Sequence, residues 1–338
     1  MSMDTDAGGA ESRRAFVGGL LMLGVVVATG LPRVRASTTD IAPRARGSAR
    51  IDVRDHGAKG DGIHDDTAAF QAAVDALPAA GGTVNVAAGD YLIDPTRSVR
   101  LRSRMRLALA PGATLRARPN AEPKANVLRG EGLQDVEISG GRIVGERDSH
   151  LGTTGEWGHG IRLRACQRVT VRDLQISRCW GDGISAGGYM SRGRWSQPGS
   201  DLLLVGVVCE GNRRQGLTLG SYRGVRVSDC QFNGNGGTAP GAGIDIEPDA
   251  DVARDIVMEN CGLSGNPGAG FQLFKRAAAV TVRNCTIERN GGPGILAVAA
   301  LDSEFNGNRI QGNRGRGVSV RAGSRNIRVD GNPVASSG

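Results

Sequence analysis

Three acidic side chains stand within five residues of one another, at Asp245, Glu247 and Asp249. They follow a four-residue insertion, residues 237–240, in an otherwise regular repeat. Alternate residues of a strand face the same side about 7 Å apart, so Asp245 and Glu247 would stand side by side. That separation suits the acid and base of glycoside hydrolysis. Like charges so close should raise one pKa, as an acid catalyst needs.

Further candidates gather into one patch when the repeats are aligned on the glycine that starts a short apolar strand. His159 and Asp182 each stand directly before that glycine and would be neighbours in adjacent coils. The intervening Ile and Leu residues point inward, so the polar columns are expected to point outward. The predicted catalytic residues are Asp245, Glu247, Asp182 and His159, and the predicted substrate-binding residues are Arg162, Arg164, Gln215, Lys275, Trp195 and Tyr222.

Trp195 and Tyr222 are included because they lie near residues 189–195, an insertion that interrupts the period. Long insertions on a solenoid usually border its binding face, where aromatic rings would stack on sugars. The alternative is that both rings pack against the coil. A chance cluster is also an alternative for the charged patch, because solenoid surfaces are rich in Asp, Glu and Arg.

The elements that would position these residues return every 23 or 24 residues. An Asn, three further residues, a Gly and a short apolar strand recur from Asn212, Asn266, Asn290 and Asn313, and Asn235 joins the series with four extra residues before its glycine. A fixed period of this length indicates stacked repeats, and the alternation within each repeat indicates strands. The pattern predicts a parallel β-helix in which each coil completes its neighbour's core. The Asn column is expected to form a ladder of stacked amides.

The first coil carries the most specific signal. It contains Gly57-Ala58-Lys59-Gly60-Asp61-Gly62, then Asp65-Asp66-Thr67 before an apolar run, then Gly81-Gly82-Thr83 and Gly89-Asp90-Tyr91. This order resembles the opening of the pectate-lyase-like superfamily, the right-handed β-helix of the rhamnogalacturonase and epimerase type. The resemblance implies an all-β fold, a single right-handed parallel β-helix. It leaves open the chemistry, because glycoside hydrolases, polysaccharide lyases, epimerases and phage tailspikes share it.

A short cap helix is expected in the same segment. Asp66 or Thr67 would cap its start, and its buried face would carry Phe70, Ala73, Val74 and Leu77. This helix would close the N-terminal end of the stack, as solenoids require.

A second resemblance concerns the patch. Gly158-His159-Gly160 is similar to the Gly-His-Gly of polygalacturonase-type hydrolases, and Gly181-Asp182-Gly183-Ile184 is similar to their Asp-Gly-Ile strand. The two elements stand in reverse order here, and the adjacent Asp-Asp pair and the Arg-Ile-Lys element of those enzymes are missing. Their catalytic residues are therefore not carried over directly.

The N-terminal residues are expected to form a signal peptide for export. Residues 12–17, Ser-Arg-Arg-Ala-Phe-Val, resemble a twin-arginine export signal, followed by an uncharged apolar stretch and a cleavage site after Ala36. A transmembrane anchor is the alternative, but the stretch is short for a span of about 20 residues. We expect a signal peptide at 1–36, a flexible linker at 37–49 and a β-helix domain at 50–334, with the cap and first coil at 50–95. The protein would be periplasmic or secreted, would meet the twin-arginine translocation machinery, and would keep no stable membrane anchor after processing.

Six cysteines invite a disulfide interpretation in an exported protein. Cys230, Cys261 and Cys285 share one inward column, however, and Cys209 falls in the adjacent one. Buried cysteine often acts as a small apolar residue, so stacked free thiols are expected. No spacing indicates a zinc site.

The chain carries 42 Lys and Arg against 34 Asp and Glu, a net charge of +8, and only three of its basic residues are lysine. Arginine suits bidentate capture of carboxylates, which favours an acidic polysaccharide as partner; an arginine-rich genome is the alternative cause. Nucleic acid is not expected, because no binding motif is present.

These features favour an exported glycoside hydrolase acting on an acidic polysaccharide. A polysaccharide lyase or epimerase acting on uronates is the second hypothesis. There, arginine or a calcium ion would neutralise the uronate carboxylate, and His159, an arginine or Lys275 would take the C5 proton. A non-catalytic polysaccharide-binding or envelope solenoid is the third. No metal ligands are predicted, and calcium enters only under the lyase hypothesis.

Overall fold

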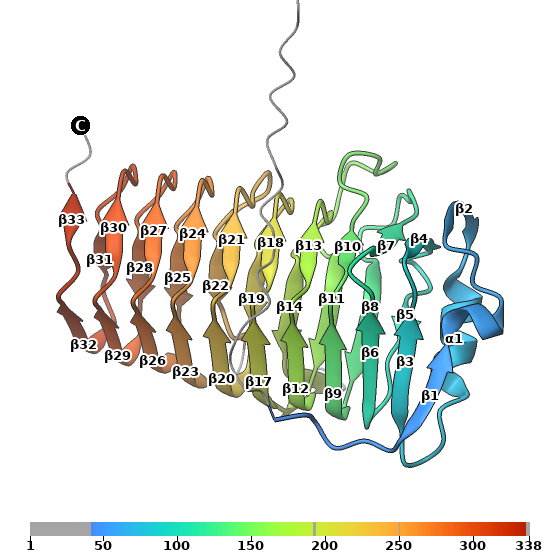
Figure 1. The fold of residues 1–338 in the computed structure, drawn as a ribbon. Coiled ribbons are helices and arrows are strands. Elements are labelled where there is room, and N and C mark those ends of the chain that lie inside the picture. Colours follow the sequence, from blue (N-terminus) through green and yellow to red (C-terminus); the bar gives the residue numbers. More distant parts are fainter. Residues whose placement is uncertain (1–41, 192–193, 250, 336–338) are drawn as a thin grey trace, which may run out of the picture. The chain divides into compact units, whose positions relative to one another are not determined.

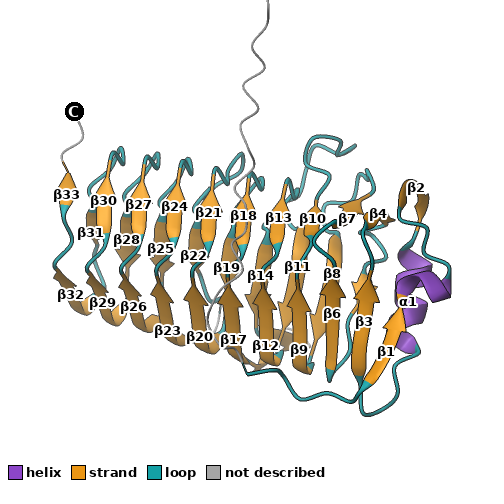
Figure 2. Cartoon of the chain, viewed as in Figure 1, coloured by secondary structure: helices purple, strands orange, loops and turns teal. Residues whose placement is uncertain are grey.

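The computed structural model describes residues 42–191, 194–249 and 251–335. Within this part of the chain nearly every element is a short strand, and the strands form three parallel sheets that run the length of a solenoid (Figures 1 and 2). Each coil adds one strand to each sheet in turn. The predicted all-β parallel β-helix is thereby confirmed.

Sheet 1 has the strand order β1 (Ala49–Asp52), β3 (Gly82–Val86), β6 (Met105–Leu109), β9 (Gln134–Ser139), β12 (Gln167–Arg172), β17 (Gly199–Val205), β20 (Tyr222–Ser228), β23 (Ala253–Glu259), β26 (Ala277–Arg283), β29 (Leu301–Asn306) and β32 (Arg325–Asp330). Sheet 2 has the order β2 (Asp61–Asp65), β4 (Gly89–Ile93), β7 (Ala113–Ala117), β10 (Arg142–Val144), β13 (Gln175–Ser177), β18 (Val208–Glu210), β21 (Gln231–Asn233), β24 (Gly262–Ser264), β27 (Thr286–Glu288), β30 (Arg309–Gln311) and β33 (Val334–Ala335).

Sheet 3 carries the candidate site. Its strands, in order from the N-terminal coils, are β5 (Val99–Arg100), β8 (Asn126–Glu131), β11 (His159–Arg164), β14 (Ile184–Gly187), β19 (Leu217–Leu219), β22 (Ile244–Ile246), β25 (Phe271–Phe274), β28 (Ile295–Val298) and β31 (Val318–Val320). A separate antiparallel pair, β15 (Tyr189–Ser191) and β16 (Arg194–Gln197), forms the insertion after β14.

The core consists of apolar side chains stacked like on like. On sheet 2, Cys209 pairs in register with Phe232, Phe232 with Leu263, and Leu263 with Ile287. These side chains are fully buried. Because alternate residues of a strand face opposite sides, one strand per coil suffices to line each wall of a narrow core.

The Asn column forms the predicted amide ladder. The backbone N–H and the side-chain Nδ2 of Asn266 both donate to Oδ1 of Asn290, at 3.0 and 2.9 Å, and the same pair of bonds joins Asn235 to Asn266. The glycine of each repeat is explained by the same stacking. A Cβ on Gly243 would lie 2.7 Å from the carbonyl oxygen of Gly270 and 2.9 Å from Nδ2 of Asn266, so no larger residue fits.

The cysteines are free and buried within the described residues, as expected. The thiols of Cys230, Cys261 and Cys285 donate to carbonyl oxygens two residues back in their own coils, at 3.1 to 3.2 Å. Burial raises the pKa of the Cys261 thiol well above its ordinary value, which keeps it protonated and unreactive.

The cap helix is also present. A 3-10 turn, η1 (Val53–His56), and the helix α1 (Thr67–Asp75) lie at the N-terminal end of the stack (Figure 1). Phe70, Ala73, Val74 and Leu77 are all buried, as predicted. Asp66 stands at the N-cap position, but its carboxylate accepts from the backbone N–H groups of Lys59 and Gly60 and makes no capping bond. The hydroxyl of Thr67, the other predicted cap, donates to Asp65 and accepts the backbone N–H of Asp94.

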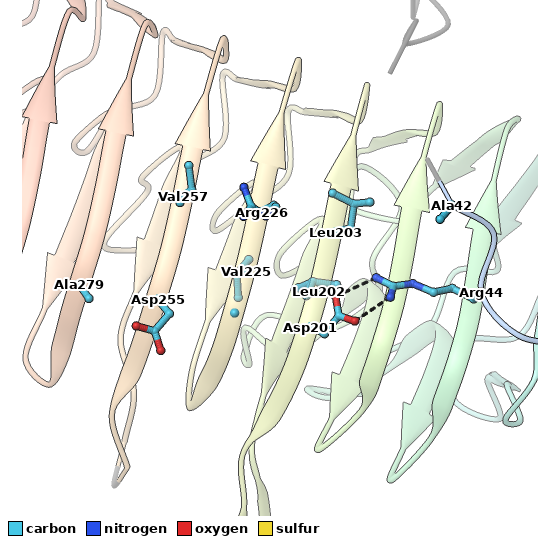
Figure 3. A pocket seen from close by; sticks show the side chains of 11 residues that line it. Ala42, Arg44, Asp201, Leu202, Leu203, Val225, Arg226, Asp255, Val257 and Ala279 are labelled. Atoms are coloured by element: carbon cyan, nitrogen blue, oxygen red, sulfur yellow. Dashed lines mark hydrogen bonds and ion pairs between the residues drawn. The ribbon is translucent and has the colours of Figure 1, made fainter. Parts of the chain in front are cut away.

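The segment before β1 differs from the flexible linker expected from composition. Arg46 donates to Glu137 on β9, and Arg44 donates to Thr170 on β12 and to Asp201 on β17 (Figure 3). The hydrogen bonds of Arg44 and Arg46 hold this segment against the outer face of sheet 1. The amino-acid composition of the segment does not predict these contacts. Residues 1–41, including the predicted export signal, lie outside the described residues. Among the helices that the structure describes, none is long and apolar enough to cross a membrane.

Candidate functional site

The outer columns of sheet 3 align as the repeat predicted. Arg162 pairs in register with Ser185, Thr218 pairs with Asp245, and Asp245 pairs with Gln272. The predicted neighbours His159 and Asp182 also meet: Nδ1 of His159 lies 3.4 Å from Oδ2 of Asp182. Sequence periodicity therefore placed the correct residues opposite one another.

The sequence predicted columns that point outward from the coil, but it did not predict that four of these side chains are buried. His159 is 3% exposed, and Asp182, Gln215 and Asp245 are fully buried. Side chains in adjacent coils stack directly on one another, and Arg214 lies over Asp182, with the two groups 3.5 Å apart. The polar column beneath the surface is therefore closed to solvent.

Arg214 lies at the centre of the site and contacts several of its acids. The sequence analysis did not predict it as a site residue. Its guanidinium faces three carboxylates: Glu156 at 3.3 Å, Asp182 at 3.5 Å and Glu247 at 3.8 Å. Burial alone would lower the pKa of Arg214, but the carboxylates, Asp182 foremost, outweigh it and raise the pKa. Arg214 was missed because it stands two residues before the strand-start glycine Gly216. The alignment of the repeats considered only the residue directly before that glycine and residues after it.

Asp245 is held between two amides. Nε2 of Gln215 donates to its Oδ2 and Nε2 of Gln272 donates to its Oδ1, both at 3.1 Å. Burial, with the negative charge of Glu247 as the second cause, raises the pKa of Asp245 to about 7. Burial likewise raises the pKa of Asp182 to about 6, although Arg214 opposes the shift. Both carboxyl groups can therefore hold a proton near neutral pH.

Glu247 and His159 differ from these two acids. The side chain of Glu247 is 37% exposed and stands directly after β22, where a ligand can reach it. His159 is neutral, because burial and then Arg164 lower its pKa well below the ordinary value. Its Nδ1 accepts the backbone N–H of Asp182 at 3.1 Å, so the ring proton is assigned to Nε2.

A basic cluster adjoins these residues on the N-terminal side. Arg162 and Arg129 both donate to Glu131, at 2.5 and 2.9 Å. Burial would raise the pKa of Glu131, but these hydrogen bonds lower it overall. Partial burial and then the neighbouring charges, Arg162 foremost, lower the pKa of Lys124. Glu131 and Lys124 belong to the coil before His159, which lacks the strand-start glycine used for alignment.

The guanidinium of Arg164 makes hydrogen bonds within the protein and is not presented to a ligand. It donates to the carbonyl oxygens of Leu163 and Ser185 and to Oγ of Ser185, at 2.9 to 3.0 Å. Lys275 is exposed just after β25, with its ammonium 4.7 Å from the ring centroid of Phe274. Of these two predicted substrate-binding residues, only Lys275 presents its charge to solvent.

The predicted role of Tyr222 is wrong. Its ring is fully buried and its hydroxyl donates to the carbonyl oxygen of Cys166 at 2.7 Å. Gly199 on the next strand makes room, since a Cβ there would lie 2.1 Å from the tyrosine ring. The side chain of Trp195 lies outside the described residues. Trp157, which is 47% exposed, follows Glu156 directly in the chain and is an exposed aromatic residue close to the site in sequence. Its position two residues before His159 was the available signal.

The described residues form no cluster of metal-ligating side chains. No group of three or more His, Cys, Asp or Glu side chains among the described residues is arranged to hold an ion. What the site offers is two buried, proton-holding carboxyl groups, an exposed carboxylate and an arginine between them. In addition, Oε1 of Gln215 is a buried acceptor without a hydrogen-bond partner among the described residues, a state that costs about 1–3 kcal/mol until a donor arrives.

Comparisons with known proteins agree with the fold. Residues 120–251 and 159–334 match the family model described as right handed beta helix region, and residues 50–134 match the one described as rhamnogalacturonase A/epimerase, pectate lyase-like. The "uncharacterized protein YclG" of Bacillus subtilis is 30% identical over 220 residues, covering 58% of this chain and 38% of that protein. The mannuronan C5-epimerase AlgE2 of Azotobacter vinelandii is 29% identical over 287 residues, 85% of this chain and 22% of the enzyme. The chain thus spans less than two fifths of either relative.

Two solved structures resemble the solenoid. The A-module of the mannuronan C-5 epimerase AlgE6 from Azotobacter vinelandii superposes with a TM-score of 0.64 at 20% identity, covering 84% of this chain and 86% of the module. Tailspike protein gp49 of the Acinetobacter baumannii bacteriophage Fri1, described as a capsular polysaccharide depolymerase, superposes with a TM-score of 0.59 at 13% identity, covering 85% and 63%. At these identities the likeness concerns the fold alone.

Proposed function

The chain belongs to the right-handed β-helix family, and on that premise we propose that it is an exported, polysaccharide-active enzyme that hydrolyses glycosidic bonds on the outer face of sheet 3. Asp245 is the general acid and Glu247 the general base. The observation that carries the proposal is the placement of Asp245, which is fully buried between the amides of Gln215 and Gln272, two residues before the partly exposed Glu247. This burial and the charge of Glu247 raise the pKa of Asp245 to about 7. Pairs of carboxyl groups in unlike environments divide the acid and base roles between them.

The reaction follows from these positions. Asp245 gives its proton to the glycosidic oxygen as the bond to the anomeric carbon breaks. Glu247 takes a proton from a water molecule that attacks the same carbon from the opposite face, and Arg214 holds Glu247 in place. Asp245 lies on β22 and Glu247 directly after it. Residues two apart in extended chain are about 7 Å apart, which leaves room for that water, so the product should have inverted configuration.

Access to Asp245 requires one movement. Its carboxyl group has no exposed surface, and the partly exposed side chain of Gln272 covers Oδ1. A bound sugar must displace that amide to reach the acid. Trp157 is exposed and follows the site residue Glu156 in the chain, and its ring would supply a face on which a sugar stacks.

The basic cluster favours a second candidate, a uronate lyase or epimerase. Arg129 and Arg162 would neutralise a uronate carboxylate, and Lys124, whose pKa is lowered, would take the C5 proton. Loss of the leaving group then gives an unsaturated sugar, and reprotonation on the other face gives an epimer. The similarity to a mannuronan C5-epimerase and to a capsular polysaccharide depolymerase supports a glycan substrate for either candidate.

The test is a screen of the purified protein against acidic and neutral polysaccharides, with and without calcium. Asp245→Asn and Glu247→Gln should each lower kcat/KM by about 100- to 10,000-fold, whereas Asp255→Asn, an exposed carboxylate on sheet 1, should leave it unchanged. New reducing ends of inverted configuration support hydrolysis. Ultraviolet-absorbing or epimerised products would transfer the proposal to the second candidate, and binding without turnover would leave a carbohydrate-binding solenoid.

A further inference from the structure

Residues 145–158 join β10 to β11 and bring Glu156 to the site, where its carboxylate lies 3.3 Å from Arg214. We call this segment the strap; it contains no helix or strand. Backbone pairing within the sheets therefore does not fix its course. The position of Glu156 depends on the side chains that hold the strap.

Trp180, which lies between β13 and β14, is covered on both faces of its ring. The ring of His150, from the strap, stacks on it with the centroids 3.8 Å apart and the planes at 13°. The guanidinium carbon of Arg213 lies 3.7 Å from the indole centroid, a distance at which a cation is attracted to the ring. Two groups this close to one ring would overlap on the same face, so they occupy opposite faces. These three side chains, the clamp, join the strap to the corner before β19.

Hydrogen bonds to the backbone reinforce the clamp. Nη1 of Arg213 donates to the carbonyl oxygen of Gly155 in the strap at 2.7 Å and to that of Trp180 at 3.3 Å. The next residue, Arg214, faces the next strap residue, Glu156. Two consecutive arginines thus contact two consecutive residues of the strap, and the first contact fixes the place of the second.

His150 contributes its flat face rather than its nitrogens. Its side chain has no exposed surface, and neither ring nitrogen has a hydrogen-bond partner among the described residues. Its Nδ1 lies 3.4 Å from Oε1 of the buried Glu146. Burial, and then the charge of Arg213 across the indole, lower the pKa of His150. An uncharged ring that makes no hydrogen bond is retained here for stacking, which a phenyl ring can also supply.

We propose that the clamp positions Glu156 against Arg214 and thereby holds this arginine beside the proposed base, Glu247. The clamp residues do not touch the substrate; they act through Glu156, and this role rests on the proposed function of the sheet 3 site. Glu156 is the nearest of the three carboxylates that Arg214 faces. When the strap is released, the arginine loses this partner, and Glu247 loses the cation that orients it.

The first test is amide hydrogen exchange in the full chain. The backbone N–H groups of Leu151 and Trp157 donate to carbonyl oxygens of the neighbouring corner at 2.8 and 3.2 Å, so their exchange reports whether the strap is in place. Trp180→Leu should speed the exchange of both amides at least about tenfold, and Trp180→Phe, which keeps a flat ring, less than about threefold. Phe305→Leu is the matched control, because it truncates a fully buried ring on β29 that is not part of the clamp. Equal exchange in Trp180→Leu and the control would overturn the clamp.

The second test is a double-mutant cycle with Glu156→Gln, which removes the charge that Arg214 faces. On a polysaccharide that the protein turns over, Trp180→Leu should lower kcat about 10- to 100-fold with little change in KM, because a displaced group costs rate more than binding. In the Glu156→Gln background the same substitution should lower kcat less than about threefold.

Equal losses of kcat in the two backgrounds would overturn the positioning role and leave the proposed hydrolysis standing. Absence of turnover in the unsubstituted protein would refute the proposed function instead. The clamp would then be decided by the exchange of the Leu151 and Trp157 amides, which needs no substrate.

Discussion

Replacing Asp245 with asparagine should remove a pH-dependent cost that the folded chain carries at neutral pH. Burial, and then the charge of Glu247, raises the pKa of Asp245 from 3.8 to about 7. Asparagine keeps the shape of the side chain and can lie between the amides of Gln215 and Gln272 once the amide that faces its Nδ2 turns to present Oε1 as an acceptor. The substitution therefore changes the protonation equilibrium with little change in packing.

The magnitude follows from the shift. Below about pH 4 the carboxyl group is protonated in both the folded and the unfolded chain, and the shift has no effect on stability. As the pH rises from about 4 to 7, the unfolded chain releases this proton while the folded chain retains it, so stability falls by about 1.4 kcal/mol per pH unit. Over about three units the loss amounts to about 4 kcal/mol and stays constant above pH 7.

The measurement is urea unfolding followed by circular dichroism between pH 4 and pH 8. The free energy of unfolding of Asp245→Asn minus that of the unsubstituted protein should grow by about 4 kcal/mol across this range. Asp182, with its pKa raised to about 6, titrates in both proteins. Asp182→Asn in both backgrounds removes its contribution and its interaction with Asp245. Asp255→Asn is the matched control, because its carboxylate is 56% exposed and surface substitutions change stability by about 0.5 kcal/mol or less.

A difference that does not vary between pH 4 and pH 7 would refute the reasoning. Asp245 would then be ionised in the folded chain, and a carboxylate that has already lost its proton cannot serve as the general acid. The proposed hydrolytic mechanism would fall with it, while the β-helix and its amide ladder would stand.

Two further predictions concern the ladder and the export signal. Asn266→Ala leaves the backbone N–H of Asn235 and the carbonyl oxygen of Phe232 without the partners they have now, so urea unfolding should show a loss of about 2–6 kcal/mol. Asn306→Ala is the control: it loses one side-chain hydrogen bond to Glu304 and should cost about 1 kcal/mol or less, and equal losses would contradict the ladder's role. Lysine at both Arg13 and Arg14 should leave the uncleaved protein in the cytoplasm in a cell-fractionation assay, whereas unchanged export would show that the twin-arginine pair is not the signal.

Much of the β-helix could be predicted from the sequence repeat. Strands that stack in register place equivalent residues of successive repeats side by side, so the period alone predicted that Thr218, Asp245 and Gln272 are neighbours. It also predicted the Asn ladder, because an amide at one fixed corner meets only its copies above and below. The first coil's resemblance predicted the cap helix and its buried face.

Only some of the residues that form the site could be predicted from the sequence. Arg214 and Glu156 lie off the compared columns, and Glu156 reaches the site from the segment between β10 and β11, 58 residues before Arg214 in the chain. Tyr222 was predicted at the surface, but it fills the space that Gly199 leaves in the core. Neither result follows from a period of 23 or 24 residues, because both depend on how a corner or an insertion packs on the coil.

The sequence by itself determined the coil, its register and the identity of the acids on sheet 3, since each depends on contacts between neighbouring repeats. The tertiary structure alone decided that Asp182 and Asp245 are buried while Glu247 is exposed. Burial depends on which other segments lie over a residue, and burial is the first cause of the raised pKa values of Asp182 and Asp245.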